Sequence, residues 1–297
     1  MPSHSLRPVL RHASVPPLPL PPVAVWRVTW TALQPQRLPA LVTTALHGAF
    51  DDAVRALGDP QLHTTLCNPP PLPDGVRGAT TRGPGAVVFA PEHYDPALPY
   101  LALREGEAVS VRVSLVGEAA LARQAEMDAA LRGVAARGLG IDPRRPDGPR
   151  PRLRYERPHR LVPPAVPAGE RVGMVMETPL HVLVGDKVQR RVEAEWMWRA
   201  MVRRVDLLAR AYGGAVEGVV LPRDAPFAVT AAQTRRVWVD RWSSTQGKRM
   251  TWPALLGSAT LAGEGLLALG PLLGFIQQVG LGKHTGFGLG RVWFVTE

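Results

Sequence analysis

The same order of expected secondary-structure elements occurs twice along the chain, and this repetition restricts the fold more than any other feature. In the first half, a β-branched apolar run at 23–30 precedes a helical pattern that begins at Pro39. Alternating apolar and polar residues at 109–115 predict a half-buried strand. Residues 118–137 predict a helix and residues 151–156 a last strand. The expected order is therefore strand, helix, strands, helix, strand.

The second half repeats this order. A strand is expected at 173–184, a long amphipathic helix at 193–212, strands at 235–242 and 255–261, a helix at 266–278 and a final strand at 291–295. The βαββαβ order is typical of the ferredoxin-like unit. The sequence thus predicts an α+β fold of two tandem ferredoxin-like (RRM-like) domains with a C-terminal glycine-rich loop. A parallel Rossmann sheet would need more alternations of strand and helix.

Prolines and glycines mark the expected domain boundaries. Residues 1–22 are proline-rich and aperiodic, so a flexible tail is expected there. The N-terminal domain is predicted at 23–157 and includes a Gly/Pro-rich insertion at 69–99. A proline-rich linker is expected at 158–172, and the C-terminal domain at 173–297.

Composition excludes several classes of protein. Hydrophobic residues make up 45% of the 297 residues, too many for a disordered chain. The single cysteine, Cys67, excludes a disulfide framework and a cysteine-rich zinc site. Because no apolar run resembles a membrane span or a secretory signal, a cytoplasmic protein is expected. The 35 Lys and Arg against 25 Asp and Glu give a net charge of +10, which fits either a polyanionic partner or a merely basic surface.

The strongest local signal is the segment 280–290, GLGKHTGFGLG, between the last expected helix and the last strand. Its glycines are Gly280, Gly282, Gly286, Gly288 and Gly290. They allow close backbone approach to another chain or a ligand, and exposed N–H groups in such a loop can bind an anion. Lys283 adds a positive charge. A nucleotide-hydrolase phosphate loop is excluded because that motif opens a helix. A tight connection without a ligand is the alternative.

A basic segment lies just upstream. Residues 235–250 contain five basic residues against Asp240 alone, interleaved with tryptophans. Basic side chains bind phosphates and aromatic rings stack on unpaired bases, so single-stranded RNA is the indicated ligand. A solvated hairpin with core tryptophans is the alternative. The candidate RNA-binding residues are Arg241, Trp242, Ser243, Gln246, Lys248 and Arg249. Seven arginines at 144–160 form a further basic stretch.

Taken together, these motifs resemble the CRISPR-associated endoribonucleases that process precursor CRISPR RNA, members of the RAMP superfamily. Segment 280–290 matches the family pattern of G-hydrophobic-G, five residues and G-hydrophobic-G at every position. Residues 243–257 resemble the family's basic hairpin, and residues 46–50 its first helix. Residues 113–117 and 138–140 fit the end of its first domain. The resemblance covers about residues 23–295 and is most specific in the C-terminal third.

The resemblance implies an endoribonuclease that needs no metal and no cofactor. In such enzymes the substrate's 2′-OH attacks the scissile phosphate and leaves a 2′,3′-cyclic phosphate and a 5′-OH. Histidine suits both proton transfers at neutral pH. His47, on the polar face of the first helix, and His284, inside the glycine-rich segment, are the candidate catalytic residues. Lys248, Arg249 and Lys283 would hold phosphates.

The implied partners are precursor CRISPR RNA and, within an effector complex, other CRISPR subunits. A noncatalytic RNA-binding RAMP subunit is the alternative function, because such proteins share the same loop. A third hypothesis is a small-molecule enzyme that binds a nucleotide on the loop. A membrane is not an expected partner.

Overall fold

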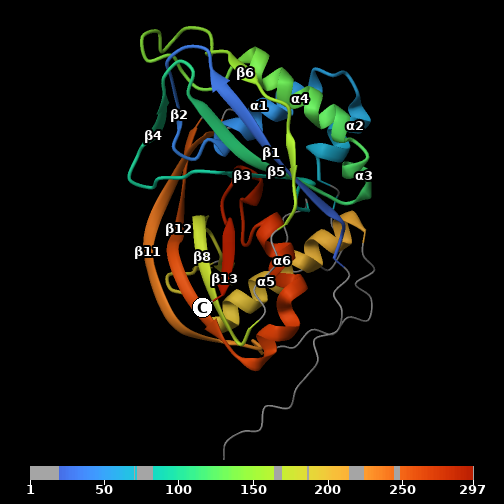
Figure 1. Cartoon of the computed structure of the whole chain (residues 1–297), viewed down its shortest axis with the longest axis vertical. Coiled ribbons are helices and arrows are strands. Elements are labelled where there is room, and N and C mark those ends of the chain that lie inside the picture. Colours follow the sequence, from blue (N-terminus) through green and yellow to red (C-terminus); the bar gives the residue numbers. More distant parts are fainter. Residues whose placement is uncertain are drawn as a thin grey trace, which may run out of the picture.

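The computed structural model describes residues 20–69, 71, 83–163, 169–185, 187–213, 224–243 and 248–296. Within them, two α+β domains lie end to end, with the N-terminal half at the top of Figure 1 and the C-terminal half below it. In this part of the chain, no helix is long and apolar enough to cross a membrane. Of the expected tail, only residues 20–22 belong to the described part.

The N-terminal domain is built on one antiparallel sheet. Its elements are β1 (Val23–Ala32), β2 (Gln36–Pro39), α1 (Thr43–Arg55), α2 (Pro60–Leu66), β3 (Val87–Pro91), β4 (Tyr100–Leu103), β5 (Ala108–Val116), α3 (Glu118–Leu121), α4 (Gln124–Arg137), β6 (Leu153–Tyr155) and β7 (His159–Leu161). The strand order is β3-β5-β1-β6, with β7 also paired to β1, while β2 and β4 form a separate two-stranded antiparallel sheet. This order places the first and third strands of a βαββαβ unit at the centre, as the ferredoxin-like fold requires.

The C-terminal domain repeats that topology. Its elements are β8 (Arg171–Leu180), β9 (Leu183–Val184), β10 (Lys187–Val188), α5 (Ala194–Tyr212), β11 (Ala228–Ser243), β12 (Lys248–Ala262), the 3₁₀ helix η1 (Glu264–Leu269), α6 (Gly270–Val279), the 3₁₀ helix η2 (Thr285–Phe287) and β13 (Val292–Thr296). The sheet order is β11-β12-β8-β13, and every pair is antiparallel. The predicted α+β fold of two tandem ferredoxin-like domains is confirmed.

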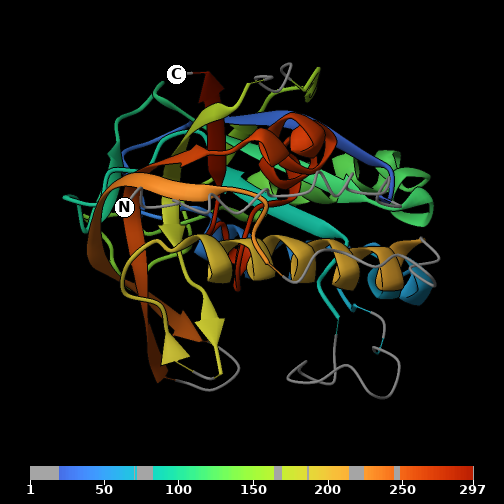
Figure 2. The same cartoon turned by 90° about the horizontal axis from the view of Figure 1, so that it is seen from below.

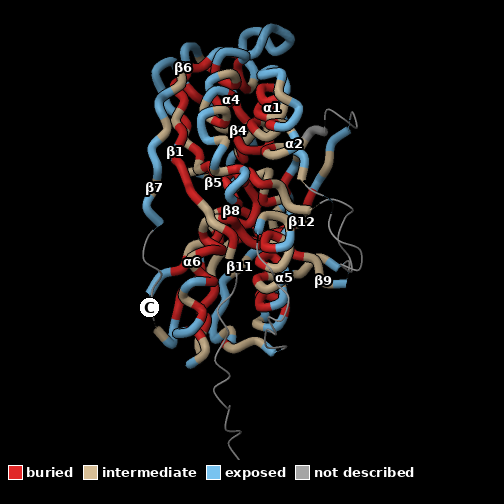
Figure 3. The backbone as a smooth tube through the Cα atoms, turned by 90° about the vertical axis from the view of Figure 1, so that its right-hand side faces the viewer, coloured by how far each residue is buried: buried red, intermediate tan, exposed pale blue. Residues whose placement is uncertain are grey.

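Each domain has its own hydrophobic core, and buried stretches occur in both halves of the chain (Figure 3). In the second core, the apolar stripe expected for the long helix is buried: Met197, Met201, Val205 and Leu208 are at most 2% exposed. Burying an apolar side chain of this size contributes about 1.5–3 kcal/mol, so the stripe fixes which face of α5 turns inward. Figure 2 shows α5 crossing the molecule toward the helices of the other domain.

Several elements differ from the sequence-based expectation. β3 lies inside the segment expected to be a Gly/Pro-rich insertion, 69–99. β7 lies inside the stretch expected to be the linker, 158–172, and pairs with β1, so the N-terminal sheet extends past residue 157. The helix expected at 118–137 is two helices, α3 and α4.

Hydrogen bonds between distant segments join the two domains. Ser114 Oγ donates to the carbonyl of Gln278 at 2.6 Å, and the Tyr212 hydroxyl donates to the carbonyl of Pro84 at 2.5 Å. The guanidinium of Arg291, which is only 5% exposed, donates to the carbonyl of Pro91. Hydrogen bonds in partly or fully buried surroundings are costly to leave unmade, so these three favour one arrangement of the two domains.

Candidate functional site

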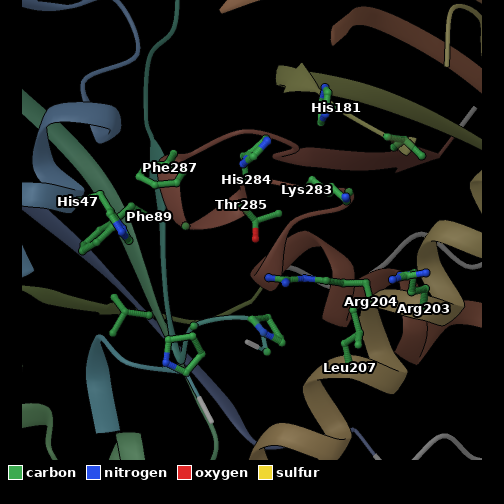
Figure 4. Close-up of a pocket in the computed structure, with 18 of the residues that line it drawn as sticks. His47, Phe89, His181, Arg203, Arg204, Leu207, Lys283, His284, Thr285 and Phe287 are labelled. Atoms are coloured by element: carbon green, nitrogen blue, oxygen red, sulfur yellow. The ribbon is translucent and has the colours of Figure 1, made fainter. Parts of the chain in front are cut away.

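A cleft of about 770 Å³ lies between the two domains. Helix α1, the end of α2 and the segment before β3 line it from the N-terminal domain, while α5, residues 181–185 and residues 282–287 line it from the other. Figure 4 shows His47 and Phe89 on one side, and His181, Lys283, His284 and the α5 residues Arg203 and Arg204 around the rest. Both histidines proposed from the sequence therefore reach one cavity.

Segment 280–290 is fastened to its own domain and to α1. The N–H groups of Leu281, Lys283, Phe287, Gly288, Leu289 and Gly290 all donate to backbone carbonyls of the protein. The Thr43 hydroxyl of α1 donates to the carbonyl of Phe287 at 2.8 Å. These six N–H groups are therefore engaged within the protein and do not cradle an anion. The backbone of the segment instead fixes the side chains of Lys283, His284 and Thr285.

Two glycines show why this segment tolerates no side chain at some positions. Gly290 has φ +73, and a Cβ there would lie 1.8 Å from the carbonyl oxygen of Leu281. Gly288 has φ +89, and a Cβ there would lie 2.0 Å from Thr43 Oγ1. Both the left-handed backbone and the close packing exclude larger residues.

His47 is half-buried on α1 and faces the segment of the other domain. Its ring lies 4.3 Å from the ring of Phe287, centroid to centroid, and meets Phe89 edge-on at 6.4 Å. Burial lowers the pKa of His47, and the charge of Arg241 lowers it further. The Asp51 carboxylate and a backbone hydrogen bond with Gly286 oppose these effects. His47 is therefore neutral at pH 7 and can accept a proton.

His284 lies in a different environment within the same cleft. Its ring stacks on Trp252 with centroids 4.0 Å apart and planes 12° apart, and it lies 5.2 Å from the ring of His181. Burial first, then the nearby positive groups, lower its pKa to about 4. His181 is 5% exposed, and its Nδ1 donates to the carbonyl of Pro253 at 2.6 Å. This hydrogen bond within the protein makes His181 a structural residue in the wall of the cleft. At neutral pH all three histidines of the cleft are uncharged.

Of the candidate residues on the basic hairpin, Arg241 is the one described side chain that reaches this region. Its guanidinium lies 4.0 Å above the ring of Phe287, the ring that His47 also contacts. Lys248 and Arg249 are exposed at the start of β12, and Arg249 pairs with Asp240. Trp242 and Ser243 end β11, where only their backbone pairing is described, and Gln246 lies outside the described residues.

Sequence reasoning missed Arg204 as a residue of the cleft. This side chain is 6% exposed, and its guanidinium donates to the carbonyl of Val279 at 2.7 Å. Its Nε has no hydrogen-bond partner among the described residues, and burial lowers its pKa to about 10. The sequence feature that could have indicated Arg204 is its position on the otherwise apolar stripe of α5, between Met201 and Val205. The guanidinium therefore contributes positive charge at the wall of the cleft, although Nε itself is covered by the protein.

Comparison with known proteins gives a family match for part of the chain and a shared fold for most of it. Residues 174–292 match the family described as CRISPR-associated endoribonuclease Cas6. A Cas6 product complex has the same fold, with a TM-score of 0.59 at 16% identity, over 92% of this chain and 100% of that chain. Cas6 from Thermus thermophilus matches with a TM-score of 0.54 at 11% identity, over 92% and 98%.

A structure described as a RAMP protein binding different RNA substrates matches with a TM-score of 0.52 at 15% identity, over 92% of this chain and 100% of that chain. No curated protein matches the sequence. The matched region holds α5, the β11–β12 hairpin and segment 280–290, whereas His47 lies outside it.

Proposed function

We propose that this chain, which is Cas6-like in its fold and in residues 174–292, is an endoribonuclease that cuts CRISPR repeat RNA in the interdomain cleft. The observation that carries the proposal is the contact between His47 on α1 and Phe287 in segment 280–290. This contact places a neutral histidine of one domain against the part of the other domain that matches the family.

The charge of the cleft suits a phosphate backbone. Among the described residues, its lining includes Arg203, Arg204 and Lys283 and one carboxylate, Asp51. Arginine and lysine bind phosphate oxygens, and such contacts position a strand without reading its bases. The apolar walls beside His47, among them Phe89 and Phe287, can pack against an unstacked nucleotide.

The proposed reaction needs no metal. The imidazole of His47 accepts the proton of the 2′-OH, and the 2′-oxygen then attacks the adjacent phosphorus. The bond from phosphorus to the 5′-oxygen breaks, and that oxygen takes a proton from water, which leaves a 2′,3′-cyclic phosphate and a 5′-OH. Arg204 and Lys283 stabilise the negative charge that develops on the phosphate. His284, with its pKa near 4 and its stack on Trp252, is less suited to transfer a proton at neutral pH.

A cleavage assay tests this function. The chain is incubated in EDTA with repeat RNA from the genome that encodes it, and the new 3′ end is analysed for a cyclic phosphate. Cleavage with this end supports the proposal, whereas cleavage that requires Mg²⁺ contradicts the mechanism.

The same assay separates the alternatives. Tight RNA binding without any cut, under conditions in which a known RNase cuts the same RNA, identifies a noncatalytic RAMP subunit. Such a protein would bind RNA in the same cleft without cutting it, and one solved structure of the same fold is described as a RAMP protein binding different RNA substrates. Saturable ATP binding without salt-sensitive RNA binding would instead support the nucleotide-binding enzyme.

A further inference from the structure

Helices α1 and α2 meet at three side chains of metal-binding type. Asp51 lies on α1, whereas His63 lies on α2 and Cys67 caps its C-terminus. One ligand atom from each residue lies within 4.8 Å of the other two. All three residues are partly buried. Carboxylate oxygen, imidazole nitrogen and thiolate sulfur are the three ligand types that Zn²⁺ takes in proteins.

The local backbone holds this arrangement in place. The N–H of Cys67 donates to the carbonyl of His63 at 2.9 Å, so one helical turn brings both side chains to the same face of α2. His63 Nε2 lies 2.8 Å from Asp51 Oδ1, which joins that face to α1. Zinc bonds of 2.0–2.3 Å place ligand atoms about 3.3–3.8 Å apart in a tetrahedron, so a small outward shift makes room for an ion.

We propose that Asp51, His63 and Cys67 form a binding site for one divalent cation of the zinc class. A carboxylate, a thiolate and a neutral imidazole carry two negative charges, which match the charge of the ion. Asp51 and Cys67 also line the interdomain cleft, so the fourth coordination position opens toward it. Three protein ligands with one open position are the pattern of an accessible zinc site.

Metal binding at this site must displace one existing hydrogen bond of Asp51. Arg55 Nε donates to Asp51 Oδ2 at 2.9 Å, but the Arg55 side chain is 61% exposed and can turn into solvent. The other oxygen, Oδ1, is the one that faces His63. On binding, the thiol proton of Cys67 is released to solvent, and the cation replaces it between the sulfur and the carboxylate. The bound ion would fasten α2 to α1 one helical turn from His47.

Cobalt provides the direct test, because Cys67 is the only cysteine and any thiolate-to-cobalt charge-transfer band belongs to it. The untagged full-length chain is stripped of metal and titrated with Co²⁺. We expect one Co²⁺ per chain, a charge-transfer band and the visible absorption of four-coordinate cobalt, all abolished by Zn²⁺. Cys67→Ser should lose the band, and His63→Gln and Asp51→Asn should each weaken binding at least tenfold.

His93→Gln is the matched control, because that histidine is outside the cluster and should leave the titration unchanged. Unfolding midpoints in EDTA show whether each variant still folds, and Zn²⁺ should raise the midpoint of the wild type but not of Cys67→Ser. A wild-type chain without the charge-transfer band overturns the proposal, as does a band that persists with unchanged affinity in His63→Gln. The proposal stands apart from RNA cleavage, since EDTA empties the site whereas the proposed cleavage mechanism uses no metal, so cleavage in EDTA and cobalt binding are tested independently.

Discussion

At the scale of single residues, His47 carries the sharpest prediction about activity. His47→Ala should slow single-turnover cleavage by roughly 10²–10⁴-fold, the usual contribution of general acid–base catalysis. RNA affinity should stay within about threefold, because Arg203, Arg204 and Lys283 remain in the cleft. Quench-flow or manual sampling with radiolabelled repeat RNA measures the rate.

The pH profile adds a second readout for His47. Burial and the charge of Arg241 lower the pKa of His47 below the ordinary value of 6.5. The imidazole is therefore mostly deprotonated at pH values above this lowered pKa. A general base works in its deprotonated form, so the cleavage rate should rise with pH through that value and level off above it. His159→Ala, on the exposed strand β7, is the control. A His47→Ala rate within about threefold of wild type would transfer the assignment to His284.

Lys283 carries a prediction about binding. Lys283→Ala should weaken binding to RNAs of different sequence alike, and the slope of log K against log salt should fall by roughly 0.7–1 unit. Arg249→Ala should give a smaller decrease, because Asp240 already pairs with that guanidinium. Filter binding over a range of salt concentrations measures both. An unchanged slope in both variants would exclude these residues from the RNA-binding surface.

At the scale of elements, the contact between α1 and segment 280–290 is the structure to perturb. Gly288→Ala adds a Cβ 2.0 Å from Thr43 Oγ1, so the segment must move away from α1 and from His47. We expect a loss of stability of about 1–3 kcal/mol and a loss of cleavage that exceeds the loss of RNA binding. Urea unfolding and single-turnover cleavage measure the two effects.

Gly106→Ala is a close control for this substitution. Gly106 has φ +84, nearly the φ of Gly288, but an added Cβ there meets nothing within 4 Å. The backbone strain is therefore similar in both variants, and only Gly288→Ala adds the clash. Equal effects of the two substitutions on cleavage would show that the contact between α1 and the segment does not support activity.

The helices and strands also show which parts of the structure the local sequence pattern could predict and which it could not. The stripe of α5 and the alternation of β5 were visible because apolar periodicity reports burial directly. β3 was missed because Val87, Val88 and Phe89 form a short apolar run between glycines and prolines, with no alternation to mark a strand. The pairing of His47 with Phe287 spans both domains, and no spacing along the chain encodes it. The sequence also predicts an exposed His47, whereas docking of the second domain buries half of it.

At the scale of the whole molecule, the uncharged histidines of the cleft make stability depend on pH. His47, His181 and His284 all have lowered pKa values, chiefly because of burial. The unfolded chain therefore binds more protons than the folded one below about pH 6.5, and stability should decrease as pH falls from there toward 4. Urea midpoints measured at several pH values should follow this decrease.

His284→Asn tests the largest contribution to this effect. Asparagine accepts the left-handed φ of 63° at this position, so the backbone is retained. Near pH 5 the number of protons taken up on unfolding should drop by about one, since the pKa of His284 is near 4. Equal proton uptake by this variant and the wild type would contradict a neutral His284 in the folded state.

The division of the cleft between two domains has an evolutionary consequence. The region that matches the family, 174–292, contains the segment and the cations that would hold RNA, but the histidine proposed to cut it belongs to α1. Selection can therefore act on RNA binding and on RNA cleavage separately. Under the proposed mechanism, one substitution at His47 would abolish cleavage and leave RNA binding, and the matched region would carry no sign of the change.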